Sequence, residues 1–194
     1  FGTPEYAQAT IASGQLARKY NIPLRASNTN ASNAPDEQSI YESQMSLWGC
    51  LLGGVNWIKH GLGWIEGGLC ASYEKVILDA EMIHMMGSFM QQPKVDSYTL
   101  GVETINEVGP GNHFFAAKQT LESYEDAFYS PLLSDWQNFE SWRDAGSLSA
   151  STRANRIWKQ LLKDYEQPTL EESIEEELNY FIEKRKSEGG VKQT

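Results

Sequence analysis

Apolar and polar positions in the first half of the chain follow the spacing of helices and strands in turn. Two stretches with helical spacing each begin after a residue that can cap a helix, Thr3 or Asp36. Two short runs of strand-forming residues follow these stretches. The predicted order is a helix over 4–20, a strand over 22–26, a polar loop over 27–35, a helix over 36–52, a strand over 55–59, a glycine-rich loop over 60–70 and a helix over 71–91. This alternation predicts an α/β fold with parallel strands.

The apolar residues of the later two helices predict which faces are buried. In the helix over 36–52 they are Ile40, Met45, Trp48 and Leu52. In the helix over 71–91 they are Val76, Ile77, Ala80, Ile83, Gly87 and Met90.

Two parallel strands do not make a stable sheet alone, because both faces and both edges need neighbours. The pattern therefore predicts a piece of a larger barrel or sheet, or a chain that pairs with another. An exposed sheet edge would favour association, including a homo-oligomer. The chain starts at Phe1 with no strand before its first helix, so we expect it to have been cut from a longer sequence.

The second half of the chain has helical patterns only. The predicted helices cover 96–108, 120–129, 135–143 and 151–165, and a last helix opens at a capping box over 169–172. The last helix is predicted to bury Leu170, Ile174, Leu178, Phe181 and Ile182.

Composition narrows the class of protein. The 194 residues are 40% hydrophobic and 22% charged, which is typical of a globular chain. The net charge of -10, with 26 acidic and 16 basic side chains and no basic patch, argues against nucleic acid as a partner. No apolar run approaches the roughly 18 residues that span a membrane, and there is no signal-peptide pattern. Cys50 and Cys70 lie far apart, which favours reduced, buried thiols in a cytoplasmic protein.

The glycine-rich loop after the second strand is the first place to look for chemistry. Polar loops at the carboxyl ends of parallel strands form the sites of α/β proteins. His60 could donate to a substrate carboxylate or act as a general acid or base; the alternative is a histidine that only bonds the backbone. Glu66 is the one acid in the loop, and its alternative is a solvated carboxylate.

Further candidates flank this loop. Asn28 and Asn30 follow the first strand and are either substrate-binding residues or ordinary turn asparagines. His113, in a rigid Gly-Pro-Gly-Asn-His turn, either orders that turn or reaches the site. Trp64 and Tyr73, together with Trp57, could surround a quaternary ammonium by cation–π attraction, or serve only in packing.

Several familiar chemistries are absent from the sequence. Three scattered histidines and two isolated cysteines give no metal cluster at ligand spacing. There is no Gly-x-Ser-x-Gly elbow and no Walker-type phosphate loop. Residues 61–63 start like a dinucleotide motif, but Glu66 stands where its third glycine is needed.

Several segments together resemble the trimethylamine methyltransferase superfamily. They are Ala-Pro-Asp-Glu-Gln-Ser-Ile-Tyr-Glu at 34–42, Gly-Leu-Gly-Trp-Ile-Glu-Gly-Gly-Leu-Cys-Ala-Ser-Tyr-Glu-Lys at 61–75, Asp-Ala-Glu at 79–81, Glu-Val-Gly-Pro-Gly-Asn-His-Phe at 107–114, and Thr120. The resemblance covers essentially the whole chain and matches the carboxyl-terminal part of those proteins. It implies the carboxyl-terminal portion of a TIM (β/α)8 barrel followed by a helical tail. Residues 1–92 would supply the last barrel units, and 93–194 the helical region packed on them.

The resemblance also implies a reaction: a methylated amine gives a methyl group to cobalt in a corrinoid carried by a separate corrinoid protein. Archaeal trimethylamine enzymes of this superfamily use pyrrolysine, whose position falls in or near residues 27–33. This loop contains only ordinary amino acids. The chain therefore resembles the non-pyrrolysine branch, which implies quaternary amines such as glycine betaine, proline betaine or carnitine.

In the site that we predict, His60 and Glu66 are the catalytic residues, and Asn28, Asn30, Trp64, Tyr73 and His113 bind the substrate. No metal is expected in this chain itself, and the chain alone is expected to be inactive. Two other interpretations stay open: a non-catalytic helical interaction fragment that presents Trp136, Phe139, Trp142 and Trp158, and a TIM-barrel lyase that binds phosphate at 61–68. An enzyme predicts that the loops over 27–33 and 60–70 converge, whereas an interaction fragment predicts that they face unrelated directions.

Overall fold

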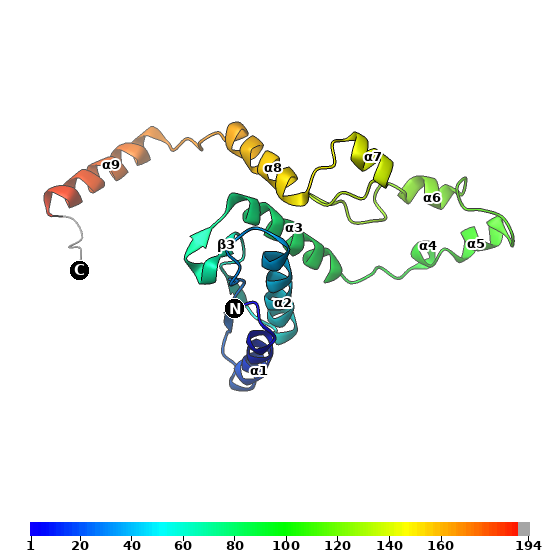
Figure 1. The fold of residues 1–194 in the computed structure, drawn as a ribbon, viewed down its shortest axis with the longest axis horizontal. Helices are drawn as coiled ribbons and strands as arrows, with labels where there is room; N and C mark the ends of the chain where they lie inside the picture. Colours follow the sequence, from blue (N-terminus) through cyan, green and yellow to red (C-terminus); the bar gives the residue numbers. More distant parts are fainter. Residues whose placement is uncertain (190–194) are drawn as a thin grey trace. The chain divides into compact units, whose positions relative to one another are not determined.

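The computed structural model describes residues 1–189 and confirms the predicted order of elements in the first half of the chain (Figure 1). That half contains α1 (Pro4–Tyr20), β1 (Arg25–Ser27), α2 (Glu37–Gly53), β2 (Trp57–Lys59), β3 (Trp64–Ile65), a 3-10 turn (Glu66–Gly68), β4 (Cys70–Ala71) and α3 (Tyr73–Phe89). The antiparallel pair β3–β4 inside the glycine-rich loop was not predicted.

The helix boundaries follow from the capping residues. The Thr3 side chain accepts the Tyr6 N–H at 3.3 Å, and Asn21 ends α1 with a left-handed φ of 53°. The Asp36 carboxylate accepts the Ser39 N–H at 3.3 Å at the start of α2. Both predicted caps are therefore confirmed.

β1 and β2 form a parallel pair in which Ala26 lies opposite Ile58, and α2 is the crossover between them. Parallel strands joined by a helix make a βαβ unit, so the α/β prediction is confirmed at this level. Among residues 1–189 the strands form two sheets of two strands each, and no closed barrel is present.

Small residues bring α1 and α2 close together. Gly14 of α1 lies against the last turn of α2, where an added Cβ would overlap the Gly53 carbonyl oxygen and lie 2.7 Å from its carbon. Arg18 donates to the same carbonyl oxygen. The predicted inward face of α2 was partly wrong, because Met45 is 41% exposed and Leu52 is 66% exposed.

Two apolar clusters surround α3. One consists of Ile77, Leu78, Leu133 and Ala154, with Ile40, Ile157 and Trp158 packed against it. The other consists of Leu47, Met82 and Met86, with Ile40, Trp48, Leu51 and Ile58. The predicted stripe of α3 shares only Ile77 with these buried residues.

The helices of the second half of the chain differ from the predicted ones in length or position, except for one that matches the helix predicted over 151–165. They are α4 (Ser97–Leu100), α5 (Val102–Val108), α6 (Lys118–Ser123), α7 (Phe139–Asp144), α8 (Ala150–Asp164) and α9 (Glu172–Ser187). Gly101, with a φ of 63°, divides the helix predicted over 96–108.

The chain consists of two compact units, residues 1–160 and 161–194. In the second unit, α9 starts at a cap, Glu171, whose side chain makes no capping bond, so the predicted capping box does not form. The stripe predicted to be buried is exposed in the structure. The boundary predicted between 92 and 93 stays a prediction. Of the helices in residues 1–189, none is long and apolar enough to cross a membrane.

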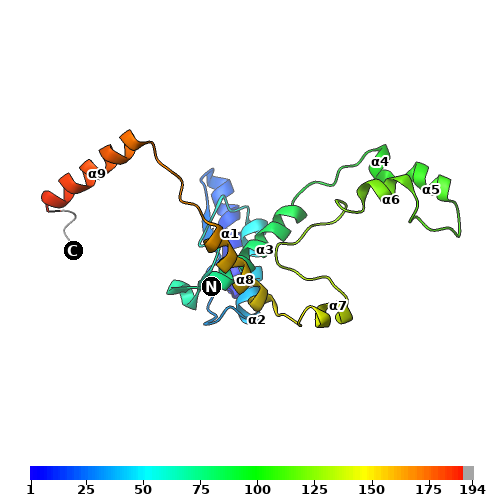
Figure 2. The same cartoon turned by 90° about the horizontal axis from the view of Figure 1, so that it is seen from above.

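Two carboxylates of α3 anchor later parts of the first unit. Glu81, which is buried, accepts the N–H groups of Leu132 and Leu133 at 2.7 and 2.8 Å. Glu74 accepts hydrogen bonds from Asn155 at 2.6 Å and from the Trp158 indole at 2.8 Å. The Glu74 bonds hold the part of α8 within residues 150–160 beside α3 (Figure 1, Figure 2).

The hydrogen bonds from Asn155 and Trp158 lower the pKa of Glu74 from its usual value near 4.5 to about 2. A carboxyl group with a depressed pKa stabilises the fold above its unfolded pKa, and this contribution is lost as the pH falls toward its folded pKa. We expect wild type to exceed Glu74→Gln in free energy of unfolding by about 1–2 kcal/mol near neutral pH. Urea unfolding at several pH values should show this difference shrinking from about pH 4.5 toward pH 2. A difference that is independent of pH would contradict the assignment.

Candidate functional site

The loops that follow β1 and β2 start at the same end of the parallel pair, and hydrogen bonds join the two loops. The Glu66 N–H donates to the Ser32 carbonyl at 2.8 Å, and the Gly67 N–H donates to the Asn30 carbonyl at 2.8 Å. The Asn28 side-chain amide donates to the Gly61 carbonyl at 2.9 Å. The two loops therefore converge, as the enzyme interpretation predicts and the interaction-fragment interpretation does not.

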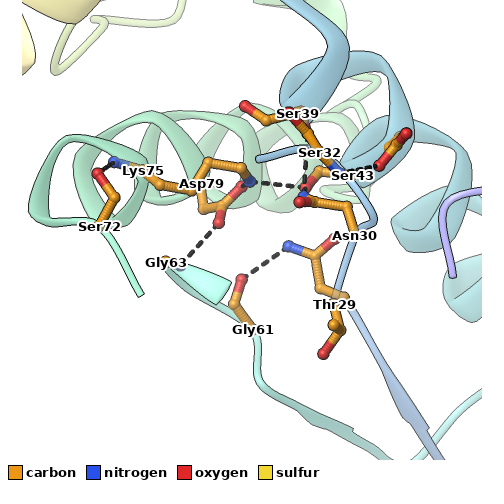
Figure 3. A network of polar contacts seen from close by, with 12 residues as sticks. Thr29, Asn30, Ser32, Ser39, Ser43, Gly61, Gly63, Ser72, Lys75 and Asp79 are labelled. Atoms are coloured by element: carbon orange, nitrogen blue, oxygen red, sulfur yellow. Dashed lines mark hydrogen bonds and ion pairs between the residues drawn. The ribbon is translucent and has the colours of Figure 1, made fainter. Parts of the chain in front are cut away.

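A buried polar network connects the first loop to α2 (Figure 3). Asn30 is 0% exposed, and its amide donates to the Ser39 carbonyl at 3.1 Å and to the Ser43 hydroxyl at 2.9 Å. Glu42, one turn along α2 and also buried, accepts the N–H groups of Ala31 and Ser32 at 2.7 and 3.0 Å. The polar face of α2 thus determines the shape of the first loop.

A buried ion pair connects the same network to the second loop. Lys75 and Asp79, one turn apart on α3, form an ion pair, and both are 0% exposed. Lys75 also donates to the Ser43 hydroxyl at 2.7 Å, and Asp79 accepts the Gly63 N–H at 2.8 Å (Figure 3). Burial lowers the pKa of Lys75 and raises the pKa of Asp79, and the attraction between the two opposes both changes.

His60 stands where β2 passes into the glycine-rich loop. Its backbone adopts a left-handed φ of 55°. Its Nδ1 lies 3.2 Å from the Ser27 hydroxyl. Its ring packs edge to face on the Trp64 ring, with 5.2 Å between the ring centroids. The half-buried imidazole is thus oriented by one residue of each strand–loop unit.

Glu66 occupies the tip of the β3–β4 hairpin, also with a left-handed φ of 55°. Its exposed carboxylate accepts a hydrogen bond from the Cys70 thiol at 2.8 Å, and this bond raises the pKa of the thiol. Both cysteines are free, but Cys70 is exposed, so the prediction of two buried thiols holds only for Cys50.

The other predicted binding residues lie in different surroundings. Tyr73 stacks on Trp158 of α8 at 4.9 Å, while Trp57 is exposed on β2. His113 is exposed in the turn after α5, where its ring packs on Phe115 at 5.2 Å. The structure brings together Asn28, Asn30, His60, Trp64 and Glu66. The ring contacts of Tyr73 and His113 are instead with Trp158 and Phe115.

The two asparagines are more deeply buried than a turn pattern suggests. Asn28 is 1% exposed, and both it and Asn30 use their NH2 groups to hold the loops. Their Oδ1 atoms have no hydrogen-bond partner in the described part of the chain. Within residues 1–189 no group of three or more histidine, cysteine, aspartate or glutamate side chains could hold a metal ion.

Three contributors to the site were missed from the sequence: Glu42, Lys75 and Asp79. Each lies on a helix at a position where a charged side chain is normally solvated. The available signal was that all three lie inside the segments that carry the family resemblance, 34–42, 61–75 and 79–81.

Polar loops converging at the carboxyl ends of parallel strands define an α/β protein with a candidate small-molecule site. Residues 1–190 match the family model of trimethylamine methyltransferases (MTTB). The chain belongs to this family, as its motifs indicated.

Individual relatives support the assignment. A glycine betaine methyltransferase of Desulfitobacterium hafniense strain Y51 is 37% identical over 190 residues, which cover 97% of this chain and 40% of that protein. The trimethylamine methyltransferase MttB2 of Methanosarcina mazei is 33% identical over 186 residues, which cover 94% of this chain and 37% of that protein. The chain thus spans about two fifths of the length of these relatives.

Proposed function

We propose that the protein transfers a methyl group from a methylated amine, specifically a quaternary amine such as a betaine, to the cobalt of a corrinoid carried by a partner protein. The observation that carries this proposal is the convergence of the two polar loops at the carboxyl ends of β1 and β2. Support for the quaternary amine comes from the loop over 27–33, which contains only ordinary amino acids, and from the glycine betaine methyltransferase among the relatives.

We further propose that β1 and β2 are neighbouring strands of a (β/α)8 barrel that this chain does not complete. Three features favour a barrel: the parallel pairing, the α2 crossover, and the site loops at the carboxyl ends. Among the described residues β1 and β2 pair only with each other, so the outer edge of each strand is free to pair with a further barrel strand.

The chemistry that this requires is a displacement at a methyl carbon. The carbon–nitrogen bond breaks, its electron pair stays on nitrogen, and two electrons from Co(I) form the new carbon–cobalt bond. A quaternary ammonium leaves as a neutral amine, so the step needs no general acid. The protein has to place the methyl group in line with cobalt and exclude water, and positioning of this kind supplies much of a rate enhancement.

In this proposal His60 and Glu66 meet the two charged ends of a betaine. The Glu66 carboxylate provides negative charge for the ammonium, and the His60 ring provides an N–H for the substrate carboxylate. The left-handed backbone at both positions holds these side chains at the loop bends. Asn28 and Asn30 hold the loops in place, and Trp64 offers an aromatic wall beside His60.

We expect His60→Ala and Glu66→Gln each to lower kcat/KM for methyl transfer at least about tenfold, or roughly 1.4 kcal/mol of transition-state stabilisation. The assay uses the intact gene product, cob(I)alamin and a quaternary amine. His84→Ala and Glu103→Gln are the matched controls, because both residues are exposed and belong to helices, α3 and α5, rather than to the two loops. Unchanged rates in both site variants would remove His60 and Glu66 from the site.

A further inference from the structure

The buried ion pair of α3 is not explained by stability alone. Lys75 and Asp79 are both 0% exposed, and removing two charges from water costs several kcal/mol for each ion. Apolar residues of similar size often serve as well or better in such a position. A buried ion pair in this position therefore needs an explanation other than its contribution to stability.

That role follows from where the remaining hydrogen bonds go. Lys75 donates a further hydrogen bond to the Ser43 hydroxyl. The same hydroxyl accepts a hydrogen bond from the Asn30 amide of the first loop. Asp79 uses its second oxygen for the Gly63 N–H of the second loop. The pair is thus the link between the two loops through α3 (Figure 3).

The loops also touch directly, through bonds on either side of Gly63 in the chain. Before Gly63, the Asn28 amide donates to the Gly61 carbonyl at 2.9 Å. The Gly67 and Glu66 N–H groups donate to carbonyls of the first loop, whereas the Gly63 N–H has the Asp79 carboxylate as its acceptor. Gly63 itself has a left-handed φ of 84° and directly precedes Trp64, the first residue of the β3–β4 hairpin. The Asp79 carboxylate therefore stabilises the bend that sets the direction of this hairpin.

We propose that Lys75 and Asp79 are positioning residues, which hold the loops over 27–33 and 60–70 in one fixed arrangement for the reaction. The catalytic part of this inference rests on the proposed function. Displacements of about 1 Å around a reacting group can lower a rate about a hundredfold, so a fixed loop arrangement has direct value for methyl transfer.

The test separates this role from a purely structural one. The double variant Lys75→Met/Asp79→Leu removes both charges at once, so neither is left buried without its partner. Lys118→Met/Glu122→Leu is the matched control, because that pair has the same i,i+4 spacing but is exposed on α6. Both are made in the intact gene product and compared by unfolding midpoint, amide hydrogen exchange and methyl-transfer kinetics.

We expect the unfolding midpoint of the double variant to stay close to that of wild type, while exchange at Gly63, Glu66 and Gly67 rises at least about tenfold. We also expect kcat to fall at least about tenfold with little change in KM, because the lost element orients bound substrate. Unchanged exchange and unchanged kcat in a folded double variant would overturn the proposal.

Ser43→Ala keeps the proposal testable if the double variant does not fold. This change leaves the ion pair in place and removes only the hydroxyl that joins it to Asn30. Exchange should then rise at Gly67, whose acceptor is the Asn30 carbonyl, and stay low at Gly63. Equal exchange at Gly67 in wild type and this variant would overturn the link. If wild type transfers no methyl group, the proposed function fails while the exchange data still decide the positioning role.

Discussion

Replacing Lys75 by methionine alone is expected to lower the free energy of unfolding by about 3–5 kcal/mol. The single change leaves the Asp79 carboxylate buried without its cation, with only the Gly63 N–H and its Ser43 contact to satisfy it. It also removes the Lys75 N–H that donates to the Ser43 hydroxyl, which is the acceptor of the Asn30 amide as well. The measurement is a urea titration of the intact protein that compares unfolding midpoints and slopes.

Lys118→Met is the matched control for this change. Its ammonium pairs with Glu122 at 3.7 Å on α6, and the Lys118 side chain is 86% exposed. Exposed pairs of this kind contribute about 0–1 kcal/mol, so the control should unfold close to wild type. A loss below about 1 kcal/mol for Lys75→Met would contradict a charged, fully desolvated pair.

Replacing Gly14 by alanine is expected to cost about 1–3 kcal/mol or more, the range for inserting an atom into a packed interior. The added methyl group would overlap the Gly53 carbonyl, which is backbone and cannot rotate away as a side chain would. α1 would have to move away from α2 and give up the Arg18 bond to the same carbonyl. Thermal unfolding of the intact protein measures the effect.

Gly87→Ala separates this overlap from the general effect of alanine in a helix. Gly87 lies within α3, and nothing stands within 4 Å of an added Cβ there. Alanine at an open helical position should stabilise by up to about 1 kcal/mol. If Gly14→Ala were as well tolerated as Gly87→Ala, the close contact of α1 and α2 would be wrong.

The local order of the first half of the chain could be predicted because it depends on neighbouring residues. Thr3 and Asp36 cap the helices that follow them, and α2 connects strands that can pair only in parallel. Parallel strands have their carboxyl ends at the same end of the sheet, so the convergence of the two loops could also be expected.

The interior of the site could not be predicted by the same reasoning. Hydrophobic periodicity assigns apolar residues to the buried face, but α2 buries Ser39, Glu42, Ser43 and Ser46 beside the loops. Which charged residues are buried depends on partners that are distant in sequence, as Lys75 and Ser43 are. Likewise, the apolar stripe of α9 predicts a buried face, yet these residues are exposed in the structure.

The short helices of the second half show a further limit. Val102 and Leu100 continue one apolar pattern, yet Gly101 between them adopts a left-handed conformation and ends the helix. A glycine inside a helical pattern permits both outcomes, and tertiary contacts decide between them.

Methyl transfer to cob(I)alamin from a panel of amines tests the proposed function most directly. The panel contains trimethylamine, glycine betaine, proline betaine and carnitine, and the intact gene product is assayed beside the 194-residue chain. We predict that the intact protein demethylates one of the quaternary amines and that the chain alone is inactive. Absence of transfer from all four amines by the folded, intact protein would contradict the proposal that these loops serve an amine methyltransferase.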